Sequence, residues 1–415
     1  MIPEPEERIA QFESLGFGMF IHYGLYSLMG KGEWIQYFEK IPRDKYAQLM
    51  SEFKAEKFRP REIAALARQA GMKYIVLTTR HHEGFSLYDT RGLSDFDITH
   101  SAAGRDLVAE FAEACRAEGI IPFLYHTTLD WHNPDYDNNF PAYLHWLRQS
   151  VEVLCTNYGK IGGFWFDGNW DRLDADWQED LLYEIIRKHQ PEAVIINNPG
   201  MGFAGKLTNK EVDVASFEQG RPVKRNQEGC LKYTAGEMSQ TINGHWGCGK
   251  NDFAYKSVPE LIKTMCVCRG AGANYLLNIG PDGSGKLPEM ACATLKILGK
   301  WIDFYRKPFY QGRPVDIRGE GDDFVLQTPD GGLFFFVFGL SDEAGDKNRP
   351  GIRIFRGITK KVECLSWVDT GKPIEFFQDE DKEMICFHAA GFDYGDNMVV
   401  RAARGQVQAS GSFGE

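Results

Sequence analysis

The chain has 415 residues, 43% of them hydrophobic, so it is long enough for two well-packed domains and is not a mostly disordered protein. Its formal net charge of −11 argues against a nucleic acid as partner, because phosphate binding requires clustered Lys and Arg side chains. No segment approaches the roughly 18 consecutive apolar residues of a membrane span, so we expect no membrane partner either.

Apolar runs typical of buried strands recur between residues 17 and 278, and each ends in a polar side chain. In chain order they are 17–21 with His22, 74–80 with His81 and His82, 120–124 with Tyr125 and His126, 162–166 with Asp167, 194–196 with Asn197 and Asn198, 212–217 with Glu218, and 273–277 with Asn278. Asp167 is the most informative of these residues. A carboxylate next to an apolar wall loses hydration, so a catalytic use explains it better than packing does.

Between these runs, apolar residues recur at helical spacing, for example in 61–68, 106–115, 143–154 and 177–186. Alternating strands and helices indicate a mainly parallel sheet. Continuous apolar strands with polar C-terminal ends favour a (β/α)8-like, TIM-type barrel, whose active site lies on that face. A doubly wound open sheet is the rival fold, although no glycine-rich nucleotide-binding motif follows any strand.

The pattern changes near residue 310. Short strand-like runs follow, separated by turn residues such as those at 329–332 and 369–371, as in an antiparallel β-sandwich. We therefore predict a barrel catalytic domain over 1–309, a C-terminal antiparallel β-sandwich over 310–405, and a flexible tail over 406–415.

The predicted mouth of the barrel combines carboxylates with imidazoles and indoles. Aromatic rings cover the apolar face of a sugar, while imidazoles and amides bond its hydroxyls. Paired carboxylates can then cleave a glycosidic bond. Metal binding is the competing use of the histidines, but His81 and His82 are adjacent, and consecutive strand residues point to opposite faces.

These residues carry a family resemblance. The motifs 17–27, Glu33-Trp34, 74–85, 164–168 and 274–281 occur in the order found in the α-L-fucosidases of glycoside hydrolase family 29, and the chain resembles that family from about residue 9 to 308. The resemblance implies a retaining exo-glycosidase on a barrel, with no metal and no other cofactor. It also implies a fucosylated oligosaccharide or glycoconjugate as substrate.

Site residues follow from the same resemblance. Asp167 matches the family's nucleophile. The predicted substrate-binding residues are His22, Glu33, Trp34, His81, His82, Tyr125, His126, Trp165 and Trp246. Two positions depart from the family pattern: His126 stands where Tyr is usual, and Pro199 follows Asn198 where an Arg is frequent.

The acid/base has two candidates. Glu218 lies at a predicted strand end, in Ser216-Phe-Glu-Gln219, which resembles Thr-Pro-Glu-Gln of the family. Glu237 lies in another segment that resembles a family motif. We favour Glu218, because a strand end can set the roughly 5 Å carboxylate spacing of a retaining enzyme.

Alternatives of other classes remain at this point. They are an α-L-galactosidase or other 6-deoxysugar hydrolase at the same site, a non-catalytic carbohydrate-binding protein, and a metal-dependent hydrolase.

The acidic start of the chain does not resemble a signal peptide, so we expect a cytoplasmic protein, or a periplasmic or secreted one if a leader was trimmed. The sequence leaves homo-oligomer formation open.

Overall fold

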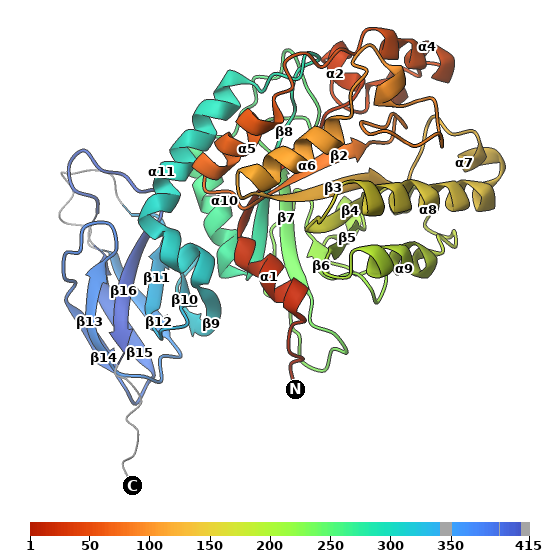
Figure 1. The fold of residues 1–415 in the computed structure, drawn as a ribbon. Coiled ribbons are helices and arrows are strands. Elements are labelled where there is room, and N and C mark those ends of the chain that lie inside the picture. Colours follow the sequence, from red (N-terminus) through yellow and green to blue (C-terminus); the bar gives the residue numbers. More distant parts are fainter. Residues whose placement is uncertain (341–350, 390, 408–415) are drawn as a thin grey trace. The chain divides into compact units, whose positions relative to one another are not determined.

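The structure, a computed structural model, describes residues 1–340, 351–389 and 391–407 (Figure 1). Contacts divide the chain into two units. The first comprises Met1–Lys256 and Ala273–Lys296, and the second comprises Ser257–Gly272 and the residues from Ile297 onward. Because this division passes through one long helix, the predicted boundary between residues 309 and 310 stays a prediction.

The first unit is built on a closed barrel of eight strands in sequence order, each parallel to its neighbours. This confirms the predicted barrel and excludes the open sheet. The strands are β1 Phe17–Ile21, β2 Tyr74–Arg80, β3 Ile121–Thr127, β4 Gly163–Asp167, β5 Val194–Asn198, β6 Val214–Ser216, β7 Ala235–Thr241 and β8 Ala273–Ile279. The polar strand ends noted in the sequence therefore meet at one rim.

Helices alternate with these strands, and α5, α6, α8 and α9 lie on the outer side of the barrel in Figure 1. The helices of the chain are α1 Glu7–Leu15, α2 Tyr26–Met29, α3 Ile35–Phe38, α4 Arg43–Ala47, α5 Pro60–Gln69, α6 Leu107–Ala117, α7 Asp135–Asn138, α8 Phe140–Asn157, α9 Glu179–His189, α10 Val258–Gly270 and α11 Glu289–Gln311. Short 3-10 turns are η1 Gln48–Ser51, η2 Ile98–His100, η3 Asn169–Arg172 and η4 Met201–Phe203. Side-chain caps fix several helix starts; Asp106, for example, accepts the amide of Ala109 at 2.8 Å.

Large side chains fill the interior of the barrel. Phe20, Tyr74, Phe123 and Trp165 are each at most 2% exposed and form one cluster with aliphatic residues of the other strands. Ile9 and Phe12 of α1 join this cluster. Aromatic side chains bury about 150–250 Å² each. The barrel is therefore a solid core beneath its rim and not a channel.

The second unit contains one eight-stranded antiparallel sheet in the order β13-β16-β11-β10-β9-β12-β15-β14. Its strands are β9 Arg313–Arg318, β10 Phe324–Gln327, β11 Leu333–Val337, β12 Gly351–Arg356, β13 Val362–Trp367, β14 Phe376–Asp379, β15 Met384–Ala389 and β16 Arg401–Val407. The sheet curls around a core that includes Phe335, Phe355 and Phe387, and the amide of Ile374, just before β14, donates to the carbonyl of Leu365 in β13 at 2.8 Å. The predicted antiparallel β domain is confirmed as a sheet folded onto itself.

The end of the chain differs in part from the prediction. Gln406 and Val407 belong to β16, where they pair with β13, so the predicted tail begins too early. Residues 408–415 lie outside the described residues. Within the described ranges, no helix is both long and apolar enough to cross a membrane.

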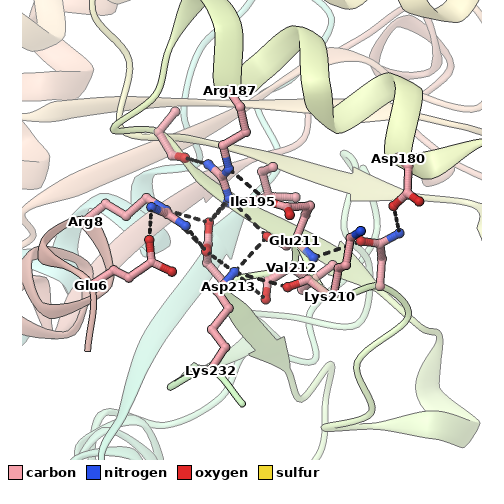
Figure 2. Close-up of polar contacts among 12 residues, drawn as sticks. Glu6, Arg8, Asp180, Arg187, Ile195, Lys210, Glu211, Val212, Asp213 and Lys232 are labelled. Carbon is pink, nitrogen blue, oxygen red and sulfur yellow. Dashed lines mark hydrogen bonds and ion pairs between the residues drawn. The ribbon is translucent and has the colours of Figure 1, made fainter. Parts of the chain in front are cut away.

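A buried carboxylate organises the amino-terminal end of the barrel (Figure 2). Asp213, directly before β6, is fully buried and contacts Arg187 at 2.7 Å, Lys232 at 2.7 Å and Arg8 at 3.1 Å, and it also accepts the amide of Ile195 at 2.8 Å. Burial acts to raise the pKa of Asp213, but the three cations outweigh it and hold the pKa below its ordinary value. The ion cluster thus ties α1, α9 and the loop before β7 to β6.

We expect Asp213→Asn to destabilise the protein by about 3 kcal/mol or more, because it leaves three cations around a neutral group at a buried site. A shift of the urea unfolding midpoint measures this effect. Asp303→Asn, which removes an exposed ion pair with Arg306, is the matched control and should leave the midpoint nearly unchanged. A carboxyl group with a lowered pKa in the folded state stabilises the fold at pH values above its ordinary pKa, and this contribution is lost as the pH falls. The difference in urea midpoint between wild type and Asp213→Asn should therefore shrink as the pH falls below about 4. Equal midpoints for wild type and Asp213→Asn at neutral pH would contradict this account.

Candidate active site

A cavity of about 660 Å³ opens at the carboxyl ends of the barrel strands, where a barrel enzyme carries its active site. It is lined by most of the predicted site residues, namely His22, Glu33, Trp34, His81, His82, Tyr125, Trp165, Asp167, Glu218 and Trp246, together with Phe20, Lys31, Gly32, Phe38, Trp170, Asn198, Gln219, His245 and residues 199–203. Residues spread over more than 220 positions of the sequence thus share one small space.

Asp167 is the last residue of β4, and its side chain is 14% exposed. It accepts hydrogen bonds from Trp170 Nε1 at 2.8 Å and Tyr125 OH at 3.1 Å, and His82 Nε2 lies 3.5 Å from Oδ2. Burial acts to raise the pKa of Asp167, but the donors His82, Trp170 and Tyr125 have the larger combined effect. The pKa of Asp167 is therefore below its ordinary value. The carboxylate is therefore ionised and held in place.

Glu218 lies two residues beyond β6. The amides of its neighbours Phe217 and Gln219 donate to carbonyls of Glu237 and Ser239 in β7, so the backbone is fixed although the strand has ended. Burial, followed by the charge of Asp167, raises the pKa of Glu218 to about 7. The carboxyl groups of Asp167 and Glu218 therefore differ in protonation at neutral pH or slightly below it.

Asn198, the last residue of β5, joins the two carboxyl groups. Its Nδ2 lies 3.2 Å from Asp167 Oδ1 and 2.7 Å from Glu218 Oε2. The nearest oxygens of the two carboxyl groups can therefore be no farther apart than the sum of these two distances. Such a bridged pair is compatible with the spacing of about 5–5.5 Å between the carboxyl groups of retaining glycosidases.

Three of the histidines that line the cavity, His22, His81 and His82, follow strands β1 and β2. Burial lowers the pKa of His22 to about 3, and its Nδ1 lies 2.7 Å from Asn278 Oδ1. Burial also lowers the pKa of His81, whose buried Nδ1 has no hydrogen-bond partner among the described residues. His82 Nδ1 lies 2.7 Å from Thr127 Oγ1. Neutral imidazoles can both donate and accept, which suits sugar hydroxyls.

His81 and His82 both reach the cavity because they lie beyond β2, where the strand alternation no longer applies. Their ring centroids are 4.2 Å apart.

Glu33 is nearly buried and accepts the amide of Gly247 through Oε2 at 2.7 Å. One carboxylate oxygen of Glu33 is thus fixed by the backbone while its side chain lines the cavity.

Aromatic side chains form the floor and one wall of the cavity. Trp165 packs against Phe20 and Tyr125 at centroid distances of 5.2 and 5.7 Å. Trp34 contacts Trp170 at 5.9 Å in a stacked arrangement. Such surfaces cover the apolar face of a sugar ring.

The placement of His126 corrects its predicted role in substrate binding. His126 is fully buried, lies outside the cavity lining, and its Nε2 is 2.8 Å from Ser150 Oγ of α8. Since β3 continues to Thr127, His126 still follows the two-residue alternation of a strand. Tyr125 faces the interior, so His126 must face the helices.

Glu237, the alternative acid/base, also lies outside the cavity lining. Its side chain is fully buried in the barrel, where Trp165 Nε1 donates to Oε1 at 2.8 Å and Tyr74 OH donates to Oε2 at 2.5 Å. Burial raises the pKa of Glu237 to about 7. Protein donors thus occupy both oxygens, and Glu237 supports Trp165 from below.

Sequence reasoning missed Trp170 and the bridging contacts of Asn198. The turn η3 begins two residues after Asp167 and brings the Trp170 indole back to that carboxylate. Gly168, with φ 117°, starts this reversal, and a glycine directly after a strand-end carboxylate was the available signal. Asn198 was detectable as a strand-end amide, but its two partners were not.

Among the described residues, no group of three or more His, Cys, Asp or Glu side chains is arranged to hold a metal ion.

The fold and the paired carboxyl groups at its rim define the protein as a glycoside hydrolase with a (β/α)8 barrel. A family model described as Alpha-L-fucosidase matches residues 5–307. The chain therefore belongs to the alpha-L-fucosidase family.

Similar proteins agree with this membership. The chain is 28% identical over 365 residues to tissue alpha-L-fucosidase of Homo sapiens, covering 79% of this chain and 75% of that protein. It is 24% identical over 371 residues to alpha-L-fucosidase of Dictyostelium discoideum, covering 80% and 78% respectively. Alpha-L-fucosidase isoenzyme 1 of Paenibacillus thiaminolyticus has a similar structure, with a TM-score of 0.84, 28% identity, and coverage of 97% of this chain and 99% of that one.

Proposed function

We propose that this protein is a retaining exo-α-L-fucosidase, in which Asp167 is the nucleophile and Glu218 the general acid/base. The observation that carries the proposal is the pair of carboxyl groups joined by Asn198, one with a lowered pKa and one with a raised pKa. Such opposite shifts assign the roles of a carboxylate pair. The family to which the chain belongs indicates that the sugar is α-L-fucose.

The reaction proceeds in two displacements. Asp167 attacks the anomeric carbon of the fucosyl group while Glu218 gives its proton to the glycosidic oxygen, so the leaving group departs as an alcohol and a fucosyl ester of Asp167 remains. Glu218, now a carboxylate, takes a proton from water. That water attacks the anomeric carbon, and the ester bond breaks to release fucose and the Asp167 carboxylate with retained configuration.

The other cavity residues fit the shape of fucose. Neutral His22 and His81, together with Glu33, offer hydrogen bonds to ring hydroxyls. Phe20, Trp165 and Trp246 offer apolar surface, which suits the methyl group that fucose carries in place of a 6-hydroxyl. A hydrophobic pocket rejects an added hydroxyl only weakly, so α-L-galactosides are the sharpest competitors.

The direct test is release of 4-nitrophenol from its α-L-fucoside, with the α-L-galactoside and β-D-galactoside beside it, each with and without EDTA. Release from the fucoside in preference to the α-L-galactoside, unaffected by EDTA, supports the proposal. Proton NMR of the first-formed sugar should show the α anomer. An initial β anomer would contradict a retaining mechanism, and no release from any of the glycosides would contradict catalysis at this site.

The pH dependence follows from the two carboxyl groups. Because Glu218 must be protonated to act as acid and its pKa is about 7, we expect kcat/KM to fall as the pH rises through about 7. The acidic limb should lie below the ordinary aspartate pKa of 3.8, because the pKa of Asp167 is lowered. The pH profile is measured with a methyl fucoside, because its leaving group needs protonation by Glu218. A value of kcat/KM that still rises above pH 8 would contradict the assignment.

A further inference from the structure

A second cavity, of about 730 Å³, lies beside the active-site cavity, and Trp170, Pro199 and Phe203 line both. Its remaining lining residues come from 169–181, which follows β4, and from 206–209, which follows β5. These are the strands that end in Asp167 and Asn198. The second cavity is therefore built on the same rim as the catalytic carboxyl groups.

The wall between the two cavities is one layer of residues thick. Trp170 donates to Asp167 on the active-site side and also lines the second cavity. Gly200 lies against the same indole, since a Cβ there would meet ring atoms of Trp170 at 3.3 Å. Asn198, which donates to Glu218, directly precedes Pro199 of the shared wall. The acid/base and the second cavity thus lie on either side of this short segment.

The rim of this wall is apolar and accessible. Met201 is 69% exposed and Phe203 is 43% exposed. A substrate whose fucosyl group fills the active site can continue past this rim, because the second cavity lies directly beside it. Both cavities fall in the range of about 300–1,000 Å³ that holds a drug-sized ligand, so together they accommodate considerably more than one monosaccharide.

The lining of the second cavity has the mixed character of a sugar site. Apolar surface comes from Leu173 and Leu181, which are 67% and 48% exposed. Hydrogen-bonding groups come from side chains of Asp176, Gln178, Asp180, Thr208 and Asn209. Carboxylates outnumber cations here, since Lys206 is the single Lys or Arg in this lining. Its Nζ lies 5.2 Å from the ring centroid of Phe203. This charge balance disfavours anionic sugars.

We infer that the second cavity is a leaving-group subsite, which binds distal uncharged sugar units of an extended or branched fucosylated oligosaccharide. The inference rests on the proposed α-L-fucosidase activity and adds the size and charge of the leaving group. Contacts with the distal sugars raise kcat/KM for oligosaccharides and leave small aryl fucosides unaffected, because an aryl leaving group carries no distal sugars to make these contacts.

The size of the leaving group is tested with Thr208→Trp, which fills the second cavity from an exposed loop position. The probes are 4-nitrophenyl α-L-fucoside and neutral pentasaccharides carrying fucose in α1,2, α1,3, α1,4 or α1,6 linkage. We expect kcat/KM for the best pentasaccharide to fall about tenfold or more, while that for the aryl fucoside stays within about twofold. Thr370→Trp, at an exposed turn of the second unit, is the matched control and should change neither value.

The charge of the leaving group is tested with the double variant Asp176→Asn and Asp180→Asn, which retains side-chain shape. We expect the wild type to prefer a neutral pentasaccharide over its sialylated counterpart by about tenfold, and the double variant to lose most of this preference. Because this variant fills no space, it also tests the subsite if Thr208→Trp fails to fold.

The outcomes separate this inference from the proposed function. If the aryl fucoside is not cleaved by the wild type, the proposed function fails. If the aryl fucoside is cleaved but Thr208→Trp affects both substrates equally, or leaves the pentasaccharide unaffected, the subsite is overturned while the enzyme assignment stands. An unchanged preference in the double variant overturns the neutral-sugar assignment.

Discussion

We expect Asp167→Asn to reduce kcat for α-L-fucosides by a factor on the order of 10⁴ or more, with the fold intact. Removing the nucleophile of a hydrolase can cost about 10⁶ in kcat, and a residual rate comes from binding and the remaining groups. The amide keeps the size of the carboxylate, and its oxygen can still accept from Trp170 Nε1. Initial rates with 4-nitrophenyl α-L-fucoside, together with the thermal unfolding midpoint, measure both parts of this expectation.

Asp171→Asn is the matched control for this variant. Asp171 lies four residues further along, in the turn η3, and accepts a hydrogen bond from Tyr136 OH outside the active-site cavity. It should retain activity close to that of the wild type. If Asp167→Asn retained more than about a tenth of the wild-type rate, a loss far too small for a missing nucleophile, Asp167 would not be the nucleophile.

We expect Glu218→Ala to affect substrates according to their leaving groups. General acid catalysis contributes about 10²- to 10⁴-fold, and a methyl fucoside, whose leaving group needs the proton, should lose that much in kcat/KM. The 4-nitrophenyl fucoside should lose considerably less, because 4-nitrophenolate departs without protonation. Azide should restore turnover by attacking the fucosyl ester in place of activated water. Its product should be the α-fucosyl azide, since two displacements retain configuration.

Glu237→Gln provides the comparison. Because Glu237 lies beneath Trp165 and outside the cavity, we expect this variant to lower the rates for both substrates by similar factors and to show no rescue by azide. A leaving-group dependence in Glu237→Gln together with its absence in Glu218→Ala would exchange the two roles.

Most of the barrel was predictable because its strands are apolar throughout. The run 162–166 and its counterparts need burial on both faces, which a parallel barrel provides. Strand β7, with the sequence AGEMSQT, was not recognised, since its interior position 237 carries a carboxyl group. Only the tertiary partners Tyr74 and Trp165 make that group tolerable in a core, and they lie far away in sequence.

The site was predictable to the extent that strand ends mark it. Asp167 ends β4 and Glu218 lies two residues beyond β6, so topology alone brings both to the same rim. His126 shows the limit of this reasoning, because one additional strand residue turned a strand-end side chain toward the helices. Strand bounds are the least certain part of any prediction from sequence, and here a shift of one position changed a role.

The curled sheet of the second unit has a consequence for how the protein meets other chains. A free sheet edge exposes a row of unpaired amides and carbonyls, which can recruit a strand from another molecule. Here the two outermost strands approach each other, with Ile374 donating to Leu365 and the amide of Val362 donating to the side chain of Gln378 at 2.8 Å. Near these contacts the sheet leaves little edge for strand addition, so its curvature protects the protein against edge-to-edge aggregation.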